Sequence, residues 1–441
     1  MKQTGILDVR EFINSRKMSA YQWGLVVLCF LIVAVDGMDV AIMGFVAPSI
    51  IHDWHISRPA FGAVMGAAPI GLAVGALLAG SSSDWIGRRK VLLVSVFGFG
   101  VTTLATAHSA TPQSMAFMRF LTGLALGAAM PNTTTLLAEY VPERIRSSVI
   151  AGMFTGFNVG SAAIGFAAAY LTPHYGWQAV LTFGGTLPLI LLPFMVFFLP
   201  ESARYLVVCG ASAERIRTVL ARVCRSNLDR WQSFISNEAP VAAKQPIAVL
   251  FAKGYSFRTV SLWLTYFMGL LVIYLTTSWL PTMMKDAGLS IDRASTLTAM
   301  FQLGGTAGAI LVGFTMDKIQ PNRVISLSYL LGGGALVVLG LAGLQSSWIV
   351  LCILATGFCL SGAQTGLNAY APGCYPTIAR ATGVSWMLGI GRFGSILGSS
   401  IGGVLLSLGW GFQSIFLTLA LPACIAAVAM LGSGLREKES F

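Results

Sequence analysis

Two aspartates, Asp36 and Asp39, lie in the middle of an apolar run from about Trp23 to Val46. An ionised Asp near the centre of a bilayer costs about 3 kcal/mol or more, so such acids normally face a bundle interior or a water-filled cavity and serve a function there. A spacing of three residues places both on roughly one helix face, and Gly37 would let a backbone or ligand come close. The alternative is a pair of acids at a helix end that reach the membrane surface.

Two arginines, Arg119 and Arg392, are the other ionisable residues well inside apolar segments. With a rise of about 1.5 Å per residue, Asp36 and Arg119 come to similar heights in the membrane. We therefore expect an ion pair between Asp36 and Arg119, and we expect Asp39 to carry a proton. Arg392 comes out near the middle of its segment, where its planar guanidinium would suit a bound carboxylate. The alternative is a structural arginine satisfied by backbone carbonyls.

The surroundings of these charges support a transport role. Glycines next to Arg392 would let a ligand or another helix approach closely: Gly389, Gly391 and Gly394. All four histidines fall in predicted outer loops: His52, His55, His108 and His174. The side chain that usually titrates near neutral pH is therefore missing from the predicted core, so a carboxylate would have to carry a transported proton.

The composition is that of an integral membrane protein, with 55% hydrophobic residues, 10% charged residues and a mean hydropathy of +0.75. About twenty helical residues cross a hydrocarbon core of about 30 Å. We therefore predict an all-α integral membrane fold of twelve transmembrane helices. They lie roughly at residues 22–46, 59–80, 91–109, 114–138, 148–171, 178–199, 258–280, 293–314, 323–343, 347–369, 382–406 and 412–434.

The net charge of +11 follows the orientation of these segments and gives no sign of a nucleic-acid-binding module. If the first loop lies outside, the inner loops and tails hold 23 lysines and arginines, and the outer loops hold three: Arg58, Lys285 and Arg293. Positive residues accumulate on the cytoplasmic side, so we expect a multi-pass protein of the inner membrane with both termini cytoplasmic. The seven cysteines contain no CxxC pair and predict neither disulfides nor a zinc site, and the first twenty residues lack a signal-peptide pattern.

The two halves of the sequence repeat the same landmarks. Three motifs recur at offsets of 233 or 234 residues: Gly80-x3-Asp84 as Gly313-x3-Asp317, Pro142-x3-Arg146 as Pro376-x3-Arg380, and Gly176-Trp177 as Gly409-Trp410. We therefore predict two six-helix halves related by an axis along the membrane normal, with a binding site between them near the midplane. The predicted parts are an N-terminal tail, a first half, a central cytoplasmic loop, a second half and a C-terminal tail: 1–21, 22–199, 200–257, 258–434 and 435–441.

The loop after the second segment resembles the signature loop of the major facilitator superfamily. It reads Gly80-Ser81-Ser82-Ser83-Asp84-Trp85-Ile86-Gly87-Arg88-Arg89-Lys90, with Trp85 where a basic residue is usual. The first segment, with Asp36-Gly37-Met38-Asp39, is similar to that of the aromatic acid/proton symporter family. Further matching stretches are Arg119-Phe120-Leu121-Thr122-Gly123, Met130-Pro131-Asn132, Leu199-Pro200-Glu201-Ser202-Ala203-Arg204, Tyr375-Pro376-Thr377, Arg380-Ala381-Thr382-Gly383 and Trp386 to Gly394.

This resemblance covers nearly the whole chain and comes nearest to the 4-hydroxybenzoate and protocatechuate transporters. It implies the major facilitator fold and import of a small aromatic carboxylate together with a proton by alternating access, in a monomer without cofactor or metal. Three positions depart from the family pattern, so substrate and pH dependence can differ: Gln178 and Asn322, where relatives can carry His, and Ser399, where Pro is common.

We assign three groups of site residues. Proton coupling is expected at Asp36, Asp39 and Arg119, and substrate binding at Arg392, Asp39, Tyr266 and Trp386. The aromatic members, like Trp279 and Tyr370, could stack on a benzoate ring, although aromatic residues in membrane spans are more often packing residues or interfacial anchors. Gating is expected in and beside the signature loops, at Gly80, Asp84, Gly87, Arg88, Arg89, Glu139, Asp317 and Arg380.

Other functions are less consistent with the residues. An exporter of aromatic compounds by proton exchange usually has a Gly-Pro pair in its fifth span, and the stretch from Gly156 to Gly165 contains no proline. An enzyme would need a nucleophile with a base, or a metal cluster, and the histidines are scattered in predicted loops. A membrane sensor would need a signalling domain, for which the central loop is short and basic. We therefore predict a carrier and not an enzyme.

Overall fold

The computed structural model describes residues 5–225, 228, 231, 233–235, 250–252, 255–343, 348–375 and 377–437, without the side chains of 79–82, 84, 377–381 and 434–437. The side chains of the predicted gating residues Gly80, Asp84 and Arg380 lie outside this description. Most of the central loop after residue 225 and the last four residues of the chain lie outside it as well.

The described residues contain twelve long helices, one for each predicted segment. In the first half they are α2 (Ala20–Trp54), α3 (Arg58–Ile86), α4 (Arg88–Ala107), α5 (Pro112–Tyr140), α6 (Glu143–Tyr175) and α7 (Trp177–Phe198). In the second half they are α11 (Ser256–Asp286), α12 (Ile291–Met316), α13 (Pro321–Ala342), α14 (Ile349–Tyr370), α15 (Thr377–Ser407) and α16 (Phe412–Glu437). The predicted helical membrane fold is confirmed.

Eleven of these described helices are long and apolar enough to cross a membrane, and α5 is the exception. Its sequence contains Arg119 and a polar run from Asn132 to Thr135, which lower its hydropathy. The same helix packs closely on α3, because Gly71 and Gly75 bring α3 against the backbone of Phe120 and Leu124. Its length and packing therefore identify α5 as a member of the bundle.

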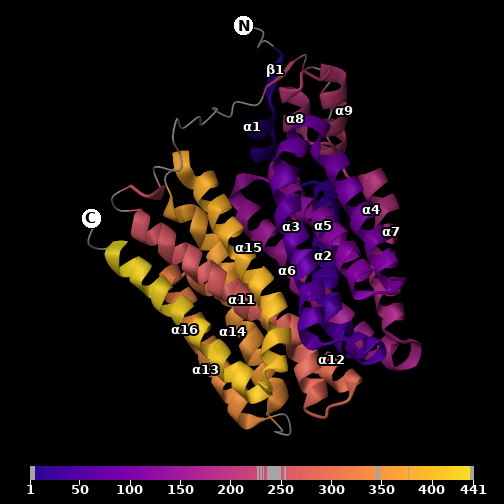
Figure 1. Ribbon diagram of the computed structural model, residues 1–441. Coiled ribbons are helices and arrows are strands. Elements are labelled where there is room, and N and C mark those ends of the chain that lie inside the picture. Colours follow the sequence, from indigo (N-terminus) through magenta and orange to yellow (C-terminus); the bar gives the residue numbers. More distant parts are fainter. Residues whose placement is uncertain are drawn as a thin grey trace.

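The second half repeats the packing of the first. In the first half α2 packs on α6, α3 on α5 and α4 on α7; at equivalent positions α11 packs on α15, α12 on α14 and α13 on α16. The two halves lie side by side in Figure 1, and they touch where α3 meets α15, α6 meets α12 and α2 meets α11. This arrangement is the one that a duplication of six helices predicts.

The helices that join the halves meet at glycines. A Cβ atom on Gly62 would lie 2.6 Å from the carbonyl oxygen of Ser400, and one on Gly44 would lie 2.4 Å from the carbonyl oxygen of Thr277. A Cβ atom on Gly403 would lie 2.3 Å from the carbonyl oxygen of Arg58. These small residues let backbones from the two halves approach closely, as is common between membrane helices.

The end of the bundle that carries the chain termini, called here the terminal end, bears structure that the sequence did not indicate (upper part of Figure 1). The segment predicted as the central cytoplasmic loop forms α8 (Ala203–Val208) and the amphipathic α9 (Ala213–Cys224). Two short strands, β1 (Ile6–Asp8) and β2 (Ser233–Ile235), pair in parallel, and α1 (Val9–Asn14) follows the first of them. We call the opposite end of the bundle the far end.

Candidate functional site

A cavity of about 450 Å³ lies between the two halves. Its apolar wall includes Leu72, Leu126, Met130, Ile150, Phe154, Phe157, Leu270 and Ile273. Its polar residues are Asp36, Asn158, Tyr266, Tyr274, Ser361, Gln364, Thr365, Asn368 and Arg392. A mostly apolar cavity of this size with a few polar groups is typical of a small-molecule site.

The cavity extends toward the terminal end of the bundle. Its wall includes Ser147, near the start of α6, and Pro372, just after α14. Both residues lie at the terminal end, because α6 begins there and α14 ends there. The far end is closed by the glycine contacts between the halves and by an ion pair between Arg58 of α3 and Asp286 of α11, with 2.8 Å between Nη2 and Oδ2.

Asp39 and Arg119 form a buried ion pair with two parallel contacts. Arg119 donates from Nη1 to Oδ1 of Asp39 at 3.0 Å and from Nη2 to Oδ2 at 2.8 Å, and Thr103 donates its hydroxyl to the same carboxylate. The side chains are only 1% and 2% exposed. Because an arginine stays charged in proteins and the carboxylate is also hydrogen-bonded, Asp39 is held as the anion.

The predicted pairing of Asp36 with Arg119 is therefore wrong. The helical rise places Arg119 at about the correct height beside α2. Height alone does not distinguish Asp36 from Asp39, because the two acids are only three residues apart. Those acids differ by about 60° around the helix axis at 3.6 residues per turn. Asp39 points toward α4 and α5, where Thr103 and Arg119 lie, whereas Asp36 lines the cavity.

Asp36 is buried in the cavity wall, and its Oδ1 atom has no hydrogen-bond partner among the described residues. Its place is fixed by close packing of α2 on α6. The Ser161 hydroxyl donates to the carbonyl of Gly37 at 2.7 Å, and a Cβ atom on Gly37 would lie 2.1 Å from the carbonyl oxygen of Phe157. An uncompensated buried carboxylate is costly, and uptake of a proton removes that cost.

Arg392 faces the same cavity from the second half. Its position depends on α11, because Cβ atoms on Gly391 and Gly394 would lie 2.1 Å from Cδ1 of Tyr266 and 2.3 Å from the carbonyl oxygen of Phe267. The predicted close approach of a helix is confirmed at Gly391 and Gly394, whereas a Cβ atom on Gly389 would have nothing within 4 Å. Arg392 makes no ion pair with a carboxylate in the described part of the chain, and its guanidinium lies beside the hydroxyl of Tyr274 in the same cavity. An anion that binds there would therefore not have to displace a carboxylate.

The aromatic predictions had mixed outcomes. Tyr266 lines the cavity. Trp386 does not, contrary to the prediction: it is 43% exposed and stacks on Trp263 with 5.7 Å between ring centroids. Trp386 lies six residues before Arg392, which turns it by about 240° on a helix of 3.6 residues per turn. Trp279 is a packing residue that donates its Nε1–H to the carbonyl of Ser399 at 2.7 Å.

A polar stripe on α14 was missed. Ser361, Gln364, Thr365 and Asn368 all line the cavity. Their spacing of three, four and seven residues places them on one face of a helix that is otherwise largely apolar. The signal in the sequence is this helical spacing, but these four side chains carry neither a charge nor an aromatic ring that would distinguish them from ordinary packing residues.

The described gating residues meet at the terminal end. Arg88 forms an ion pair with Glu139, and the hydroxyl of Ser202 donates to Glu139 as well. Glu201 accepts from the backbone N–H of Arg89 at 3.1 Å. Gly87 has a positive φ of 97°, and a Cβ atom there would lie 2.6 Å from Oε2 of Glu201. The tight reversal at Gly87 brings Arg88 close to Glu139.

Asp317 stands apart from this network, because it is exposed at the C-terminal cap of α12. Glu139 lies outside the cavity wall, in agreement with the expectation that it does not bind substrate.

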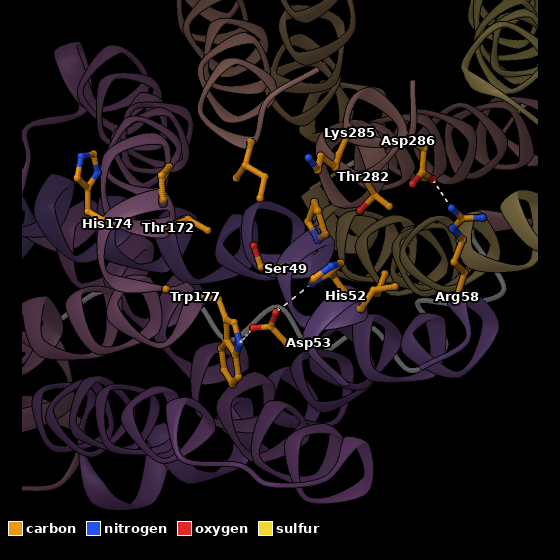
Figure 2. Close-up of a pocket in the computed structure, with 15 residues that line it drawn as sticks. Ser49, His52, Asp53, Arg58, Thr172, His174, Trp177, Thr282, Lys285 and Asp286 are labelled. Carbon is orange, nitrogen blue, oxygen red and sulfur yellow. Dashed lines mark hydrogen bonds and ion pairs between the residues drawn. The ribbon is translucent and has the colours of Figure 1, made fainter. Parts of the chain in front are cut away.

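The far end contains a second cavity of about 670 Å³, lined by residues from both halves. Figure 2 shows the Arg58–Asp286 ion pair on one side of it and, on the other, Asp53 between His52 and Trp177. The indole N–H of Trp177 donates to Asp53 at 3.1 Å. His52 and His174 line this cavity, while His55 and His108 cap α2 and α4 at the same end. The predicted absence of histidine from the central cavity wall holds for the residues described there.

Comparisons with known proteins show the family to which the chain belongs. Residues 29–290 and 262–440 match the family model described as Major Facilitator Superfamily. The chain is 56% identical over 428 residues to a gallate transporter of Pseudomonas putida, covering 97% of this chain and 95% of that one. It is 49% identical over 430 residues to a 4-hydroxybenzoate transporter of Pseudomonas aeruginosa, covering 97% and 96%. These relatives are named as transporters, which agrees with the prediction of a carrier and not an enzyme.

A solved structure supports the fold alone. The crystal structure of a D-xylose-proton symporter matches with a TM-score of 0.72 and 17% sequence identity, covering 93% of this chain and 97% of that one.

The buried ion pair generates a prediction about stability. Arg119→Met leaves Asp39 as a buried charge without its partner, so it should cost about 3 to 5 kcal/mol of stability. Adding Asp39→Asn should restore most of that loss, because the remaining amide is neutral. Thermal unfolding of the purified protein in detergent measures both effects. Arg58→Met, which breaks a partly exposed pair worth at most about 1 kcal/mol, is the control. Additive losses in the double variant would contradict the assignment.

Proposed function

The chain belongs to the major facilitator superfamily, and we propose that it imports a small aromatic carboxylate together with a proton across the inner membrane. The observation that carries the proposal is that an acid and an arginine line one cavity between the halves. Among the described residues, Oδ1 of Asp36 has no hydrogen-bond partner and Arg392 makes no ion pair with a carboxylate. The 56% and 49% identical relatives are named for gallate and 4-hydroxybenzoate, which are both hydroxylated benzoates.

The distribution of charge supports an inward-facing state. The cavity extends toward the terminal end. The loops and tails at that end contain 23 lysines and arginines, whereas the loops at the far end contain three. By the positive-inside rule the terminal end is cytoplasmic. The far end, with its histidines and the Arg58–Asp286 pair, is then the outer side.

Substrate binding is assigned to Arg392. Its fork of N–H groups matches the two oxygens of a carboxylate, and the anion in turn needs such a partner when it leaves water. The rings of Tyr266, Tyr274, Phe154 and Phe157 line the same cavity and supply an apolar, aromatic surface for the substrate ring.

Proton coupling is assigned to Asp36, and Asp39 is no longer the first choice because Arg119 holds it as an anion. Asp36 and Arg392 interact electrostatically across the cavity. When a substrate carboxylate binds Arg392, a second negative charge comes near Asp36, and a proton on Asp36 relieves the repulsion. Release of that proton to the cytoplasm restores the attraction between Asp36 and Arg392 and helps to displace the substrate. The network around Glu139 and Arg88 would act on the conformational cycle and not on affinity.

The role of Asp36 predicts a separation of two activities. Asp36→Asn should abolish proton-driven accumulation while preserving exchange of labelled for unlabelled substrate, because a neutral amide resembles the protonated carboxyl but cannot release a proton. Both activities are measured in proteoliposomes with an imposed pH gradient. Asp292→Asn, an exposed acid in the first turn of α12, is the control and should behave as wild type. Normal accumulation by Asp36→Asn would remove Asp36 from the mechanism.

The anion site predicts how the protein treats an uncharged analogue. Wild type should bind 4-hydroxybenzoate far more tightly than its methyl ester, and Arg392→Ala should lose most of that discrimination. Arg392→Lys keeps the charge without the planar fork and should fall between them. Direct binding to the purified protein measures all three. If Arg392→Ala binds the acid normally and still rejects the ester, the carboxylate is recognised by another group.

A further inference from the structure

The polar stripe on α14 has no role in the proposed proton and carboxylate chemistry. We propose that Gln364 donates a hydrogen bond to a ring hydroxyl of the substrate and so selects hydroxylated benzoates over benzoate. This inference rests on the proposed function, because it assumes that an aromatic carboxylate occupies the cavity that Gln364 lines.

The amide of Gln364 is held in one orientation. Tyr329 of α13 is fully buried and donates its hydroxyl to Oε1 of Gln364 at 2.6 Å. The pair occupies the space beside Gly269 of α11, where a Cβ atom would lie 2.2 Å from Oε1 and 2.3 Å from the Tyr329 hydroxyl. With Oε1 accepting from Tyr329, Nε2 lies at the opposite end of the amide.

The opposite end of the amide lacks a partner. Nε2 of Gln364 is buried and makes no hydrogen bond to any described residue, although the side chain as a whole is only 7% exposed. A buried donor left unsatisfied is costly, typically about 1 to 3 kcal/mol. A ligand with an acceptor atom would remove that cost, and a phenolic oxygen is an acceptor that carries no full charge to compete for Arg392.

The ring of Tyr266 lies between Gly391 and the polar stripe. Gly391, next to Arg392 in the chain, packs on Cδ1 of Tyr266, and the hydroxyl of Tyr266 lies near Gln364 and Asn368. One phenol ring therefore reaches from the backbone beside Arg392 to the polar stripe.

Selection of 4-hydroxybenzoate over benzoate follows from the free-energy cost of leaving Nε2 of Gln364 without an acceptor. Benzoate could satisfy Arg392 but would leave Nε2 of Gln364 unpaired, whereas 4-hydroxybenzoate would satisfy both. A site built to hydrogen-bond a hydroxyl rejects the analogue that lacks it for this reason.

The test is the ratio of affinities for 4-hydroxybenzoate and benzoate, measured by direct binding to the full chain in detergent. Gln364→Met keeps the volume but removes the donor, so it should weaken 4-hydroxybenzoate binding roughly tenfold and leave benzoate binding nearly unchanged. Gly269→Ala keeps every polar group but displaces the Tyr329–Gln364 pair, and it should lower the same ratio. Gln302→Met is the matched control, because Gln302 is buried on α12 and bonded to Thr277 outside the cavity wall.

The outcomes separate this inference from the proposed function. A ratio near one in Gln364→Met, with the wild-type ratio in Gln302→Met, supports it. The wild-type ratio in Gln364→Met and Gly269→Ala overturns it while the carrier assignment stands. Failure of wild type to bind any benzoate overturns the proposed function and the inference together.

Discussion

The rest of this structure depends on one constraint, the burial of the Asp36 carboxylate. Its Oδ1 atom has no hydrogen-bond partner among the described residues. Asp39 lies three residues further along α2 and differs from Asp36, because Arg119 and Thr103 compensate its negative charge. The paired acid fixes α2 against α4 and α5. The unpaired acid is costly as an anion, and that cost is what allows a proton and a substrate anion to become linked in one cavity.

Alternating access requires that the contacts at the far end can open. The Arg58–Asp286 pair is about two-thirds buried on each side, with 39% and 36% exposure, and a pair of this kind contributes at most about 1 kcal/mol. The glycine contacts at Gly44, Gly62 and Gly403 bring backbone against backbone. Both kinds of contact let the halves separate as bodies while the packing inside each half is retained.

The sequence was sufficient for the architecture and for the identity of the charged residues, but not for their directions. The sequence predicts the twelve apolar segments, the repeat offset and the two intramembrane arginines. These features depend only on the hydropathy and the spacing of residues along the chain. The choice of Asp39 over Asp36 as the partner of Arg119, and the turn of Trp386 away from the cavity, depend on the rotation of α2 and α15. That rotation is set by packing with neighbouring helices, which a single segment does not encode. Gln364 was readable in principle, since its spacing with Ser361 and Asn368 is helical.

The central claim is that substrate and proton move together through the cavity of Asp36 and Arg392. Its most direct test uses proteoliposomes that enclose a pH-sensitive dye and start with no pH gradient. When 4-hydroxybenzoate is added outside, the account predicts acidification of the lumen that rises with the amount of substrate entering, with at least one proton for each anion. Entry of the substrate with no more acidification than in protein-free liposomes would contradict it.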